Sequence, residues 1–190
     1  GRLFLLLATD GQVYARPYFN IDGQVFYILD DVPRAASYNI CNFTIPGERP
    51  LSLAMPAPPL FAQNPAAPAV RNFDGVVSTT VTVNRNLMDF YTNYPPCHWS
   101  VYAATALTAP VCGQLYPPLR AAVAGKGERE AAELLLHYLH RAFPYKTDEA
   151  QFGIERTLFA EEMYYYPYSD CEDRSILFAR LVKDLLGLDV

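Results

Sequence analysis

The start of the chain alternates between short apolar runs and turn residues. The runs are rich in Val, Ile, Leu, Phe and Tyr, and they cover Arg2–Ala8, Gln12–Phe19 and Gln24–Leu29. Asp10-Gly11 and Asp22-Gly23 separate them, and Asp-Gly between two such runs is a strong signal for a tight β-hairpin. The pattern predicts an antiparallel β-meander.

Strand and loop signals continue as far as residue 110. An apolar run predicts a strand at Tyr38–Ile45. Seven prolines between Pro46 and Pro68 exclude a helix or a central strand, so we expect residues 46–72 to form a long surface loop. The elements predicted beyond this loop are a strand at Val76–Asn84, a short helix at Asn86–Tyr94 ended by Pro95-Pro96, and a last strand at Trp99–Leu107.

The period of the apolar positions changes after Pro110. In Glu128–Phe143 they fall on one face of a helix, which carries Ala131, Ala132, Leu135, Tyr138, Leu139 and Ala142. Leu119–Ala124 predicts a shorter helix before it, and Cys171–Leu186 predicts a final helix that ends at Gly187. The predicted fold class is α+β, with an antiparallel β-rich region at 1–110 and a helical segment at 111–190.

Charge supports these two regions and narrows the choice of partners. Residues 1–110 carry no lysine, whereas 111–190 hold nine basic and thirteen acidic residues. A net charge of −5 without a basic cluster argues against nucleic acid. Leu3–Ala8 is too short to span a bilayer, so we expect no membrane insertion. The sequence begins with Gly1 and not with Met, so the compartment stays open. Removal of a signal peptide would explain this start, which favours the cell envelope or secretion over the cytoplasm.

The candidate metal and thiol sites have simpler structural interpretations. The four cysteines form no C-x-x-C pair, which argues against a zinc ribbon. Glu133, His137 and His140 have the spacing of ligands on a helix, but no further ligand accompanies them and a helix C-terminus favours histidine without a metal. We therefore expect no metal and no cofactor. The disulfide pairing of Cys41, Cys97 and Cys112 stays open.

Cys97 and His98 are neighbours that offer a second thiol and imidazole. Adjacent residues of a strand point to opposite faces, so this pair would not bond as a catalytic dyad if Trp99 begins a strand. We expect it to serve packing.

Ser169, Asp170, Cys171 and Glu172 have the form of a capping box at the start of the last helix. In such a box the Ser169 hydroxyl accepts the backbone N–H of Glu172, and the Glu172 carboxylate accepts that of Ser169. Cys171 then lies in the first turn, where exposed N–H groups and the helix dipole favour a thiolate. The charges of Glu172 and Asp173 oppose this effect unless they point away from the sulfur. The position alone also fits a small, unreactive structural cysteine.

At these residues the chain resembles the transglutaminase-like superfamily, whose members have a papain-like cysteine enzyme fold. The matching segment runs from Tyr168 to Leu177 (YSDCEDRSIL) and continues with Leu181 and Leu185–Leu188. Upstream, Tyr116–Ala124 and the helix Glu128–Phe143 with Pro144-Tyr145 resemble the helices and the aromatic stretch before the family's cysteine. Ser169 stands where the family usually has glycine. The resemblance covers residues 116–190, the N-terminal part of such a domain.

The resemblance implies a cysteine acyl transferase or peptidase that acts on peptide or protein amides through a thioester. Cys171 would be the nucleophile, and its own N–H would contribute to the oxyanion hole. In the family a histidine and an aspartate follow on strands after the cysteine helix. None of the residues after Cys171 is histidine, so we expect the chain alone to be inactive.

Three further expectations accompany this interpretation. Tyr165, Tyr166 and Tyr168, with Asp170, are candidates to line a substrate cleft, although they fit the core and rim of a tight turn equally well. The alternative function is a non-catalytic binding or scaffolding module that retains the fold. Without covering strands, Leu177, Leu181 and Leu185 would lack part of their partner surface, so we expect dimerisation, strand exchange or limited stability.

Overall fold

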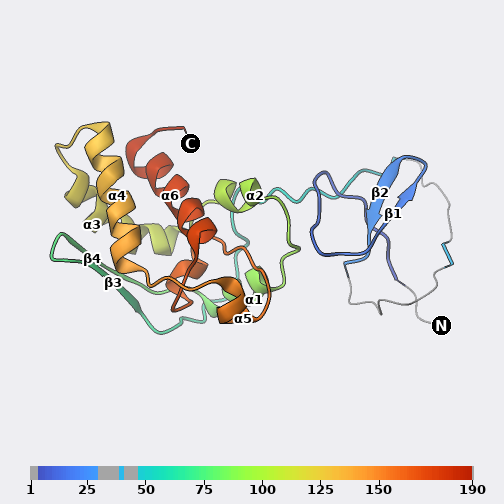
Figure 1. Cartoon of the computed structure of the whole chain (residues 1–190), viewed down its shortest axis with the longest axis horizontal. Helices are drawn as coiled ribbons and strands as arrows, with labels where there is room; N and C mark the ends of the chain where they lie inside the picture. The colour runs from blue at the N-terminus through green and yellow to red at the C-terminus, as the bar shows by residue number, and fades with distance from the viewer. Residues whose placement is uncertain (1–3, 30–38, 41–46, 190) are drawn as a thin grey trace. The chain divides into compact units, whose positions relative to one another are not determined.

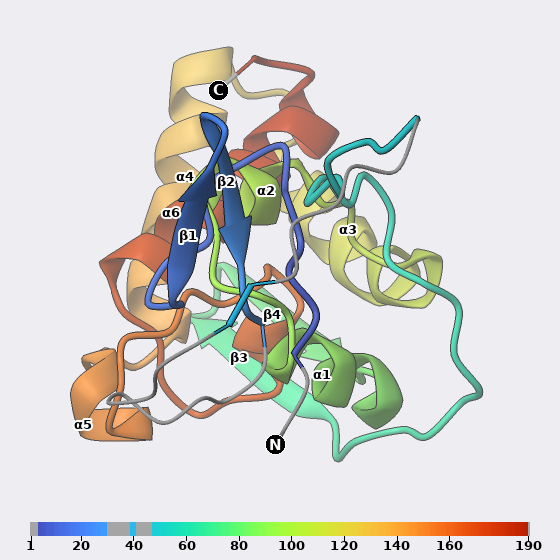
Figure 2. The same cartoon turned by 90° about the vertical axis from the view of Figure 1, so that its right-hand side faces the viewer.

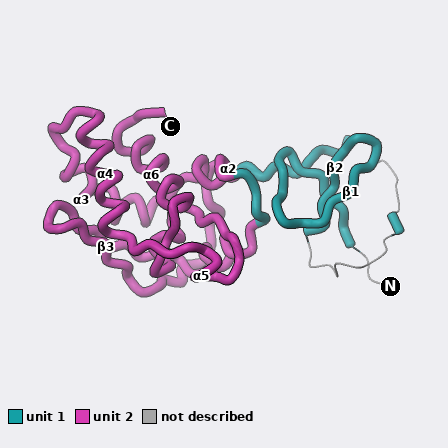
Figure 3. Tube along the Cα trace, in the orientation of Figure 1, with its two compact units in different colours: residues 1–54, 95–98 teal, residues 55–94, 99–190 magenta. Residues whose placement is uncertain are grey.

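The computed structural model describes residues 4–29, 39–40 and 47–189, which form an α+β fold. These residues make two small antiparallel hairpins and six α-helices, and the C-terminal half is mostly helical (Figure 1). The chain forms two compact units, unit 1 with residues 1–54 and 95–98, and unit 2 with residues 55–94 and 99–190 (Figure 3). This division differs from the regions 1–110 and 111–190 because the second hairpin and the first helix belong to unit 2.

Unit 1 contains the hairpin of β1 (Tyr18–Ile21) and β2 (Gln24–Tyr27). Asp22 and Gly23 both have positive φ, 51° and 82°, as a two-residue type I′ turn requires. The hairpin predicted at this pair is confirmed.

The hairpin predicted at Asp10-Gly11 is wrong. The Asp10 carboxylate accepts the Ser52 hydroxyl at 2.6 Å and the N–H of Leu53 at 2.9 Å. The Asp10 side chain therefore connects its segment to Ser52 and Leu53 and does not form a hairpin turn. The strand predicted at Tyr38–Ile45 falls outside the described residues except at 39 and 40.

The hairpin of unit 2 consists of β3 (Ala69–Phe73) and β4 (Val77–Val81). In β4 the residues Val77, Thr79 and Val81 are buried, and those between them are exposed, so the predicted alternation is confirmed. β3 overlaps the stretch predicted as a loop. It was missed because it follows Pro68 directly and carries Arg71 and Asn72 in its middle.

Three helices follow this hairpin. α1 (Arg85–Thr92) is confirmed, and the Asn84 side chain caps it by accepting the N–H of Asn86. α2 (Trp99–Ala104) is a helix, so the strand predicted there is wrong. The helix has only six residues and buries only Tyr102 among them, so its sequence shows no helical period. α3 (Ala109–Val123) is longer than the predicted Leu119–Ala124, because Pro117 and Pro118 lie inside it rather than ending it.

In the core of unit 2, the β3–β4 hairpin packs against α3 and α4 (Glu128–Ala142), and α6 (Cys171–Leu186) packs against α4 and α2. α4 and α6 lie side by side in Figures 1 and 2, and both match their predicted ranges closely. Leu177 and Leu181 are fully buried and Leu185 is half-buried, so the prediction that these three residues lack part of their partner surface is wrong for Leu177 and Leu181. Dimerisation stays a prediction. No helix of the described residues is long and apolar enough to cross a membrane.

A buried hydrogen-bond chain crosses this core. The Tyr138 hydroxyl of α4 hydrogen-bonds with the Thr79 hydroxyl of β4 at 2.7 Å and with the Tyr164 hydroxyl at 3.1 Å. Tyr164 belongs to the short 3-10 turn η1 (Glu162–Tyr164), which precedes the Cys171 segment. The remaining helix, α5 (Asp148–Phe152), lies between α4 and η1 in the sequence.

Candidate functional site

Cys171 is the first residue of α6, and its side chain is exposed. A capping box encloses this helix start, but it is formed by Asp170 and Asp173 rather than by Ser169 and Glu172. Asp170 Oδ1 accepts the N–H of Glu172 at 3.0 Å and of Asp173 at 3.2 Å, while Asp173 Oδ2 accepts the N–H of Asp170 at 3.2 Å. The predicted box is wrong by one residue.

Ser169 does not cap the helix because its backbone is paired elsewhere. It forms a parallel bridge with Tyr145, in which its N–H donates to the Pro144 carbonyl and its own carbonyl accepts the N–H of Lys146. The segment that follows α4 therefore lies beside Ser169, two residues before Cys171. This pairing fixes the path of the chain into Cys171.

The acids next to Cys171 are bound by the segment before η1. Glu172 Oε1 accepts the Thr157 hydroxyl at 2.8 Å, and Asp173 Oδ1 accepts the N–H of Leu158 at 2.9 Å. Burial raises the pKa of Asp173 to about 7, so its negative charge is reduced near neutral pH. The repulsion that Asp173 was expected to exert on a Cys171 thiolate is therefore weaker.

Arg174 completes a polar network beneath the helix start. Its Nη2 donates to the Phe143 carbonyl at 2.7 Å, and its guanidinium lies 5.2 Å from the centre of the Tyr145 ring. Arg174 and Asp173 are therefore not an exposed ion pair.

Tyr145 is a site residue that the sequence indicated only through the family resemblance. Its side chain is 55% exposed, and the charge of a Cys171 thiolate, together with the hydrogen bond between the two side chains, raises the pKa of Tyr145 above its ordinary value. Tyr145 therefore stays a neutral phenol that can donate to the sulfur.

The predicted tyrosines occupy different environments. Tyr164 is buried in the core, whereas Tyr165 and Tyr168 are each 39% exposed. The ring of Tyr166 packs edge-on against Phe152 at 5.0 Å, and its hydroxyl accepts from the Arg156 guanidinium at 2.8 Å. Cleft lining by Tyr165, Tyr166, Tyr168 and Asp170 stays a prediction.

A groove of about 410 Å³ lies beside α6. One wall is a stripe of α6 and the other is part of α2, and the lining residues are Trp99, Ala103, Glu172, Ser175, Ile176 and Ala179. Trp99 is 56% exposed, and the Ser175 hydroxyl donates to the Cys171 carbonyl at 2.7 Å. The groove is thus apolar for most of its length and acidic at the end near Cys171.

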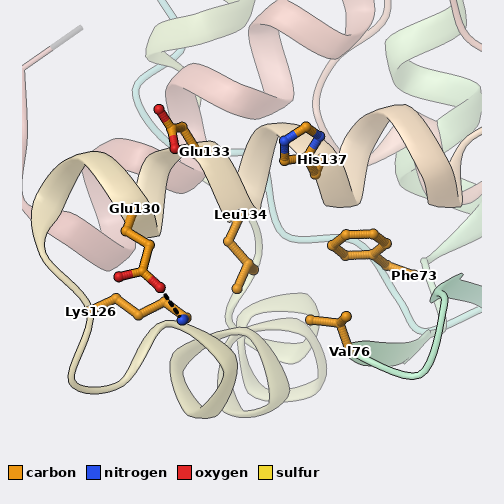
Figure 4. Close-up of a pocket in the computed structure, with 7 residues that line it drawn as sticks. All are labelled: Phe73, Val76, Lys126, Glu130, Glu133, Leu134 and His137. Carbon is orange, nitrogen blue, oxygen red and sulfur yellow. Dashed lines mark hydrogen bonds and ion pairs between the residues drawn. The ribbon is translucent and has the colours of Figure 1, made fainter.

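A second, more open hollow of about 280 Å³ lies between α4 and the β3–β4 turn (Figure 4). Phe73 and Leu134 line it, together with an ion pair of Lys126 and Glu130. His137 contacts the Phe73 ring at 6.4 Å between centroids. The hollow brings together no reactive group beyond this histidine.

In the described part of the chain, neither His137 nor His140 hydrogen-bonds to Cys171, and Glu133 is paired with Arg129. Cys97 is buried in a bridge with Val13. Cys112 is a free thiol that donates to the Leu107 carbonyl at 3.7 Å, and burial raises its pKa.

Asp148, Glu155 and Asp170 form a carboxylate cluster that sequence reasoning did not find. Each offers an oxygen that lies within 4.8 Å of the other two. Burial, and then the charges of Asp170, Glu155 and Glu172, raise the pKa of Asp148 to about 6. Seven residues separate the first pair and fifteen the second, so no local motif reveals the cluster.

No family model, curated protein or solved structure matches this chain.

Proposed function

We propose that the intact protein is a transglutaminase-like cysteine acyl transferase or peptidase that acts on peptide amides, with Cys171 as the nucleophile. The observation that carries this function is the exposed thiol at the first position of a capped helix. The resemblance of residues 116–190 to the first part of such a domain supports the same assignment, because two predicted helices and the cysteine segment occur in the expected order.

The helix start provides a donor for the negative charge that develops during acyl transfer. The Asp170 carboxylate takes the N–H groups of Glu172 and Asp173, and no acceptor among the described residues takes the N–H of Cys171. A carbonyl oxygen attacked by the Cys171 sulfur can therefore accept this N–H. The positive end of the helix dipole acts on the same oxygen.

The proposed reaction has two steps. The Cys171 thiolate adds to the amide carbonyl, and the C–N bond breaks as the leaving amine takes a proton, which gives a thioester. Water or a second amine then attacks the thioester and returns the thiolate. The proton transfers need a general base, and the resemblance places a histidine and an aspartate for this role on strands after the cysteine helix in the intact protein.

The first test is the pH profile of alkylation, with Cys112 as an internal control. Iodoacetamide labelling of each cysteine is followed by mass spectrometry from about pH 5 to about pH 9. We expect Cys171 to be labelled faster than Cys112 throughout this range, because Cys171 is exposed at a helix start whereas burial raises the pKa of Cys112. Equal profiles for the two thiols would contradict the proposed role of Cys171.

The second test is turnover by the intact protein. Incorporation of a fluorescent primary amine into a glutamine peptide measures transfer, and release of a free acid measures hydrolysis. Cys171→Ser should abolish both reactions, whereas Cys112→Ser should retain them, since Cys112 lies on α3 and is no part of the proposed site.

The alternative is a binding or scaffolding module that uses the groove beside α6. The exposure of Trp99 favours this reading, because a large aromatic residue at the mouth of an apolar groove is typical of recognition surfaces. Ordinary alkylation of Cys171, combined with loss of partner capture on Trp99→Ala, would support the module.

A further inference from the structure

The carboxylate cluster next to Cys171 is assembled from three separate segments. Asp148 is the first residue of α5, Glu155 lies in the loop after this helix, and Asp170 is the N-cap of α6. Their nearest oxygens lie within 4.8 Å of one another. Three carboxylates at this separation repel each other unless a positive charge lies between them.

No cation of the described residues forms a salt bridge with these carboxylates, and the Arg156 guanidinium acts on Asp148 only from a longer distance. The nearest cation in the sequence, Arg156, forms an ion pair with Glu162 and donates to the hydroxyls of Tyr166 and Thr92. Only the backbone N–H of Arg156 reaches the cluster, where it donates to Asp148 Oδ2 at 2.9 Å. In the residues that the structure describes, Asp148, Glu155 and Asp170 form no salt bridge.

Asp148 gives a second and independent indication of a missing ligand. Its side chain is only 3% exposed, and its Oδ1 is buried without a hydrogen-bond partner in the described part of the chain. A buried carboxylate oxygen without a partner is costly, so such groups are normally paired or bound to a metal. The partner of this oxygen is therefore expected to come from outside the protein.

We propose that Asp148, Glu155 and Asp170 form a binding site for one Ca²⁺ ion. Carboxylate oxygens are ligands that hard divalent cations prefer. Ca²⁺–oxygen distances of about 2.4 Å allow oxygens up to about 4.8 Å apart around one ion, whereas Mg²⁺ at about 2.1 Å requires a tighter set. The three oxygens lie within 4.8 Å of one another, so small side-chain adjustments bring them into the first shell of Ca²⁺, whose coordination geometry is flexible, whereas Mg²⁺ demands near-ideal octahedral geometry.

The hydrogen bonds of the cap leave a free ligand atom on Asp170. Both backbone N–H groups of the cap bind Oδ1, so Oδ2 is available for the ion. Glu155 is exposed and can adjust its side chain, and water can fill the remaining positions of the coordination sphere. A bound ion would connect α5 and its following loop to the residue that precedes Cys171. This site goes beyond the proposed function and does not depend on it.

Calorimetric titration of the chelator-treated chain with CaCl₂ tests the site. We expect one Ca²⁺ per chain, and binding of Mg²⁺ weaker by at least about tenfold. Asp148→Asn and Asp170→Asn should each weaken Ca²⁺ binding by at least about tenfold, since each removes a charged ligand. Asn is a good N-cap, so the second variant keeps the start of α6. Glu149→Gln is the matched control, because it changes an exposed acid of the same helix outside the cluster.

Circular dichroism of each variant separates loss of the site from loss of the fold. If Asp148→Asn unfolds, Asp170→Asn and the exposed-site variant Glu155→Gln decide the question. Absence of heat and of any melting shift at about 10 mM Ca²⁺ would overturn the assignment. Unchanged affinity in both Asp170→Asn and Glu155→Gln would do the same. An unmodified chain that does not respond to Ca²⁺, together with a more stable Asp148→Asn variant, would identify Asp148 as a buried, protonated carboxyl instead.

Discussion

Leu158 donates its backbone N–H to the carboxylate of Asp173 at 2.9 Å, and this hydrogen bond joins the Cys171 helix to the segment before η1. The other oxygen of the same carboxylate accepts the N–H of Asp170. One fully buried side chain therefore holds the helix cap and its neighbouring segment in a single arrangement. Because Cys171 lies between the two ends of this cap, the position of the thiol depends on it.

Asp173→Ala should destabilise the chain more than Asp173→Asn. Alanine leaves the buried N–H of Leu158 and the half-buried N–H of Asp170 without acceptors, at a cost of about 3 kcal/mol in the free energy of unfolding. Asparagine retains one acceptor oxygen, so we expect a loss of about 1 kcal/mol. Urea unfolding followed by circular dichroism measures both values. Equal losses in the two variants would show that the side chain acts by volume rather than by hydrogen bonding.

Tyr145→Phe should slow the alkylation of Cys171 at neutral pH. The Tyr145 phenol can donate to the thiolate, and the raised pKa of Tyr145 keeps its proton in place. Loss of one such bond corresponds to a rate lower by about threefold to tenfold. The labelling rate of Cys171 with iodoacetamide at pH near 7 is the measurement.

Tyr168→Phe is the matched control for this experiment, since Tyr168 is an exposed tyrosine in the segment that leads into Cys171 and stacks under Lys146 instead. A similar change in rate for both variants would contradict a specific role of Tyr145.

The sequence predicted the long helices of unit 2 better than the details of the site. The apolar stripe from Ala131 to Ala142 and the one beginning at Leu177 are strong local signals, and α4 and α6 follow them. α3 was truncated in the prediction because Pro117 and Pro118 resemble a helix end, whereas tertiary packing against β4 maintains the helix through them.

The site depended on contacts that no local pattern contains. The helix cap is Asp170 and not the predicted Ser169, because the backbone of Ser169 is extended and paired with Tyr145. The helix therefore begins one residue later than its capping pattern predicts. The carboxylate cluster requires α5 to fold against the segment before Cys171, so its members are far apart in the sequence. A capping box can be predicted from sequence only when tertiary pairing does not hold the expected cap residue in another conformation.

The stability of the chain should decrease as the pH rises toward neutrality, in part because of Glu162. This side chain is fully buried, and burial raises its pKa from 4.5 to about 7 despite the ion pair with Arg156. The folded state then binds a proton more tightly than the unfolded state. The contribution is complete below the unfolded value of 4.5 and is lost as the pH rises through about 7.

The expected loss from Glu162 between these limits is about 3 kcal/mol in the free energy of unfolding. Glu162→Gln cannot titrate, so its stability should change less over the same pH range than that of the unmodified chain. Denaturant unfolding at several pH values provides the comparison. Glu130→Gln, which changes an exposed acid, should leave the slope as it is, and an unchanged slope in Glu162→Gln would show that the ion pair keeps Glu162 ionised.

Tyr138→Phe should destabilise unit 2 through the buried hydroxyl chain. Tyr138 hydrogen-bonds with both Thr79 and Tyr164, so removal of its oxygen leaves two buried hydroxyls that must find other partners. We expect a loss of about 1–3 kcal/mol in the free energy of unfolding, seen as a lower midpoint in thermal unfolding.

Tyr164→Phe removes the hydroxyl at the end of this hydrogen-bond chain and should cost less, because Tyr138 keeps its bond to Thr79. If the two single losses add up in the double variant, the three hydroxyls act independently; a smaller combined loss would show that they form one coupled network between β4, α4 and η1.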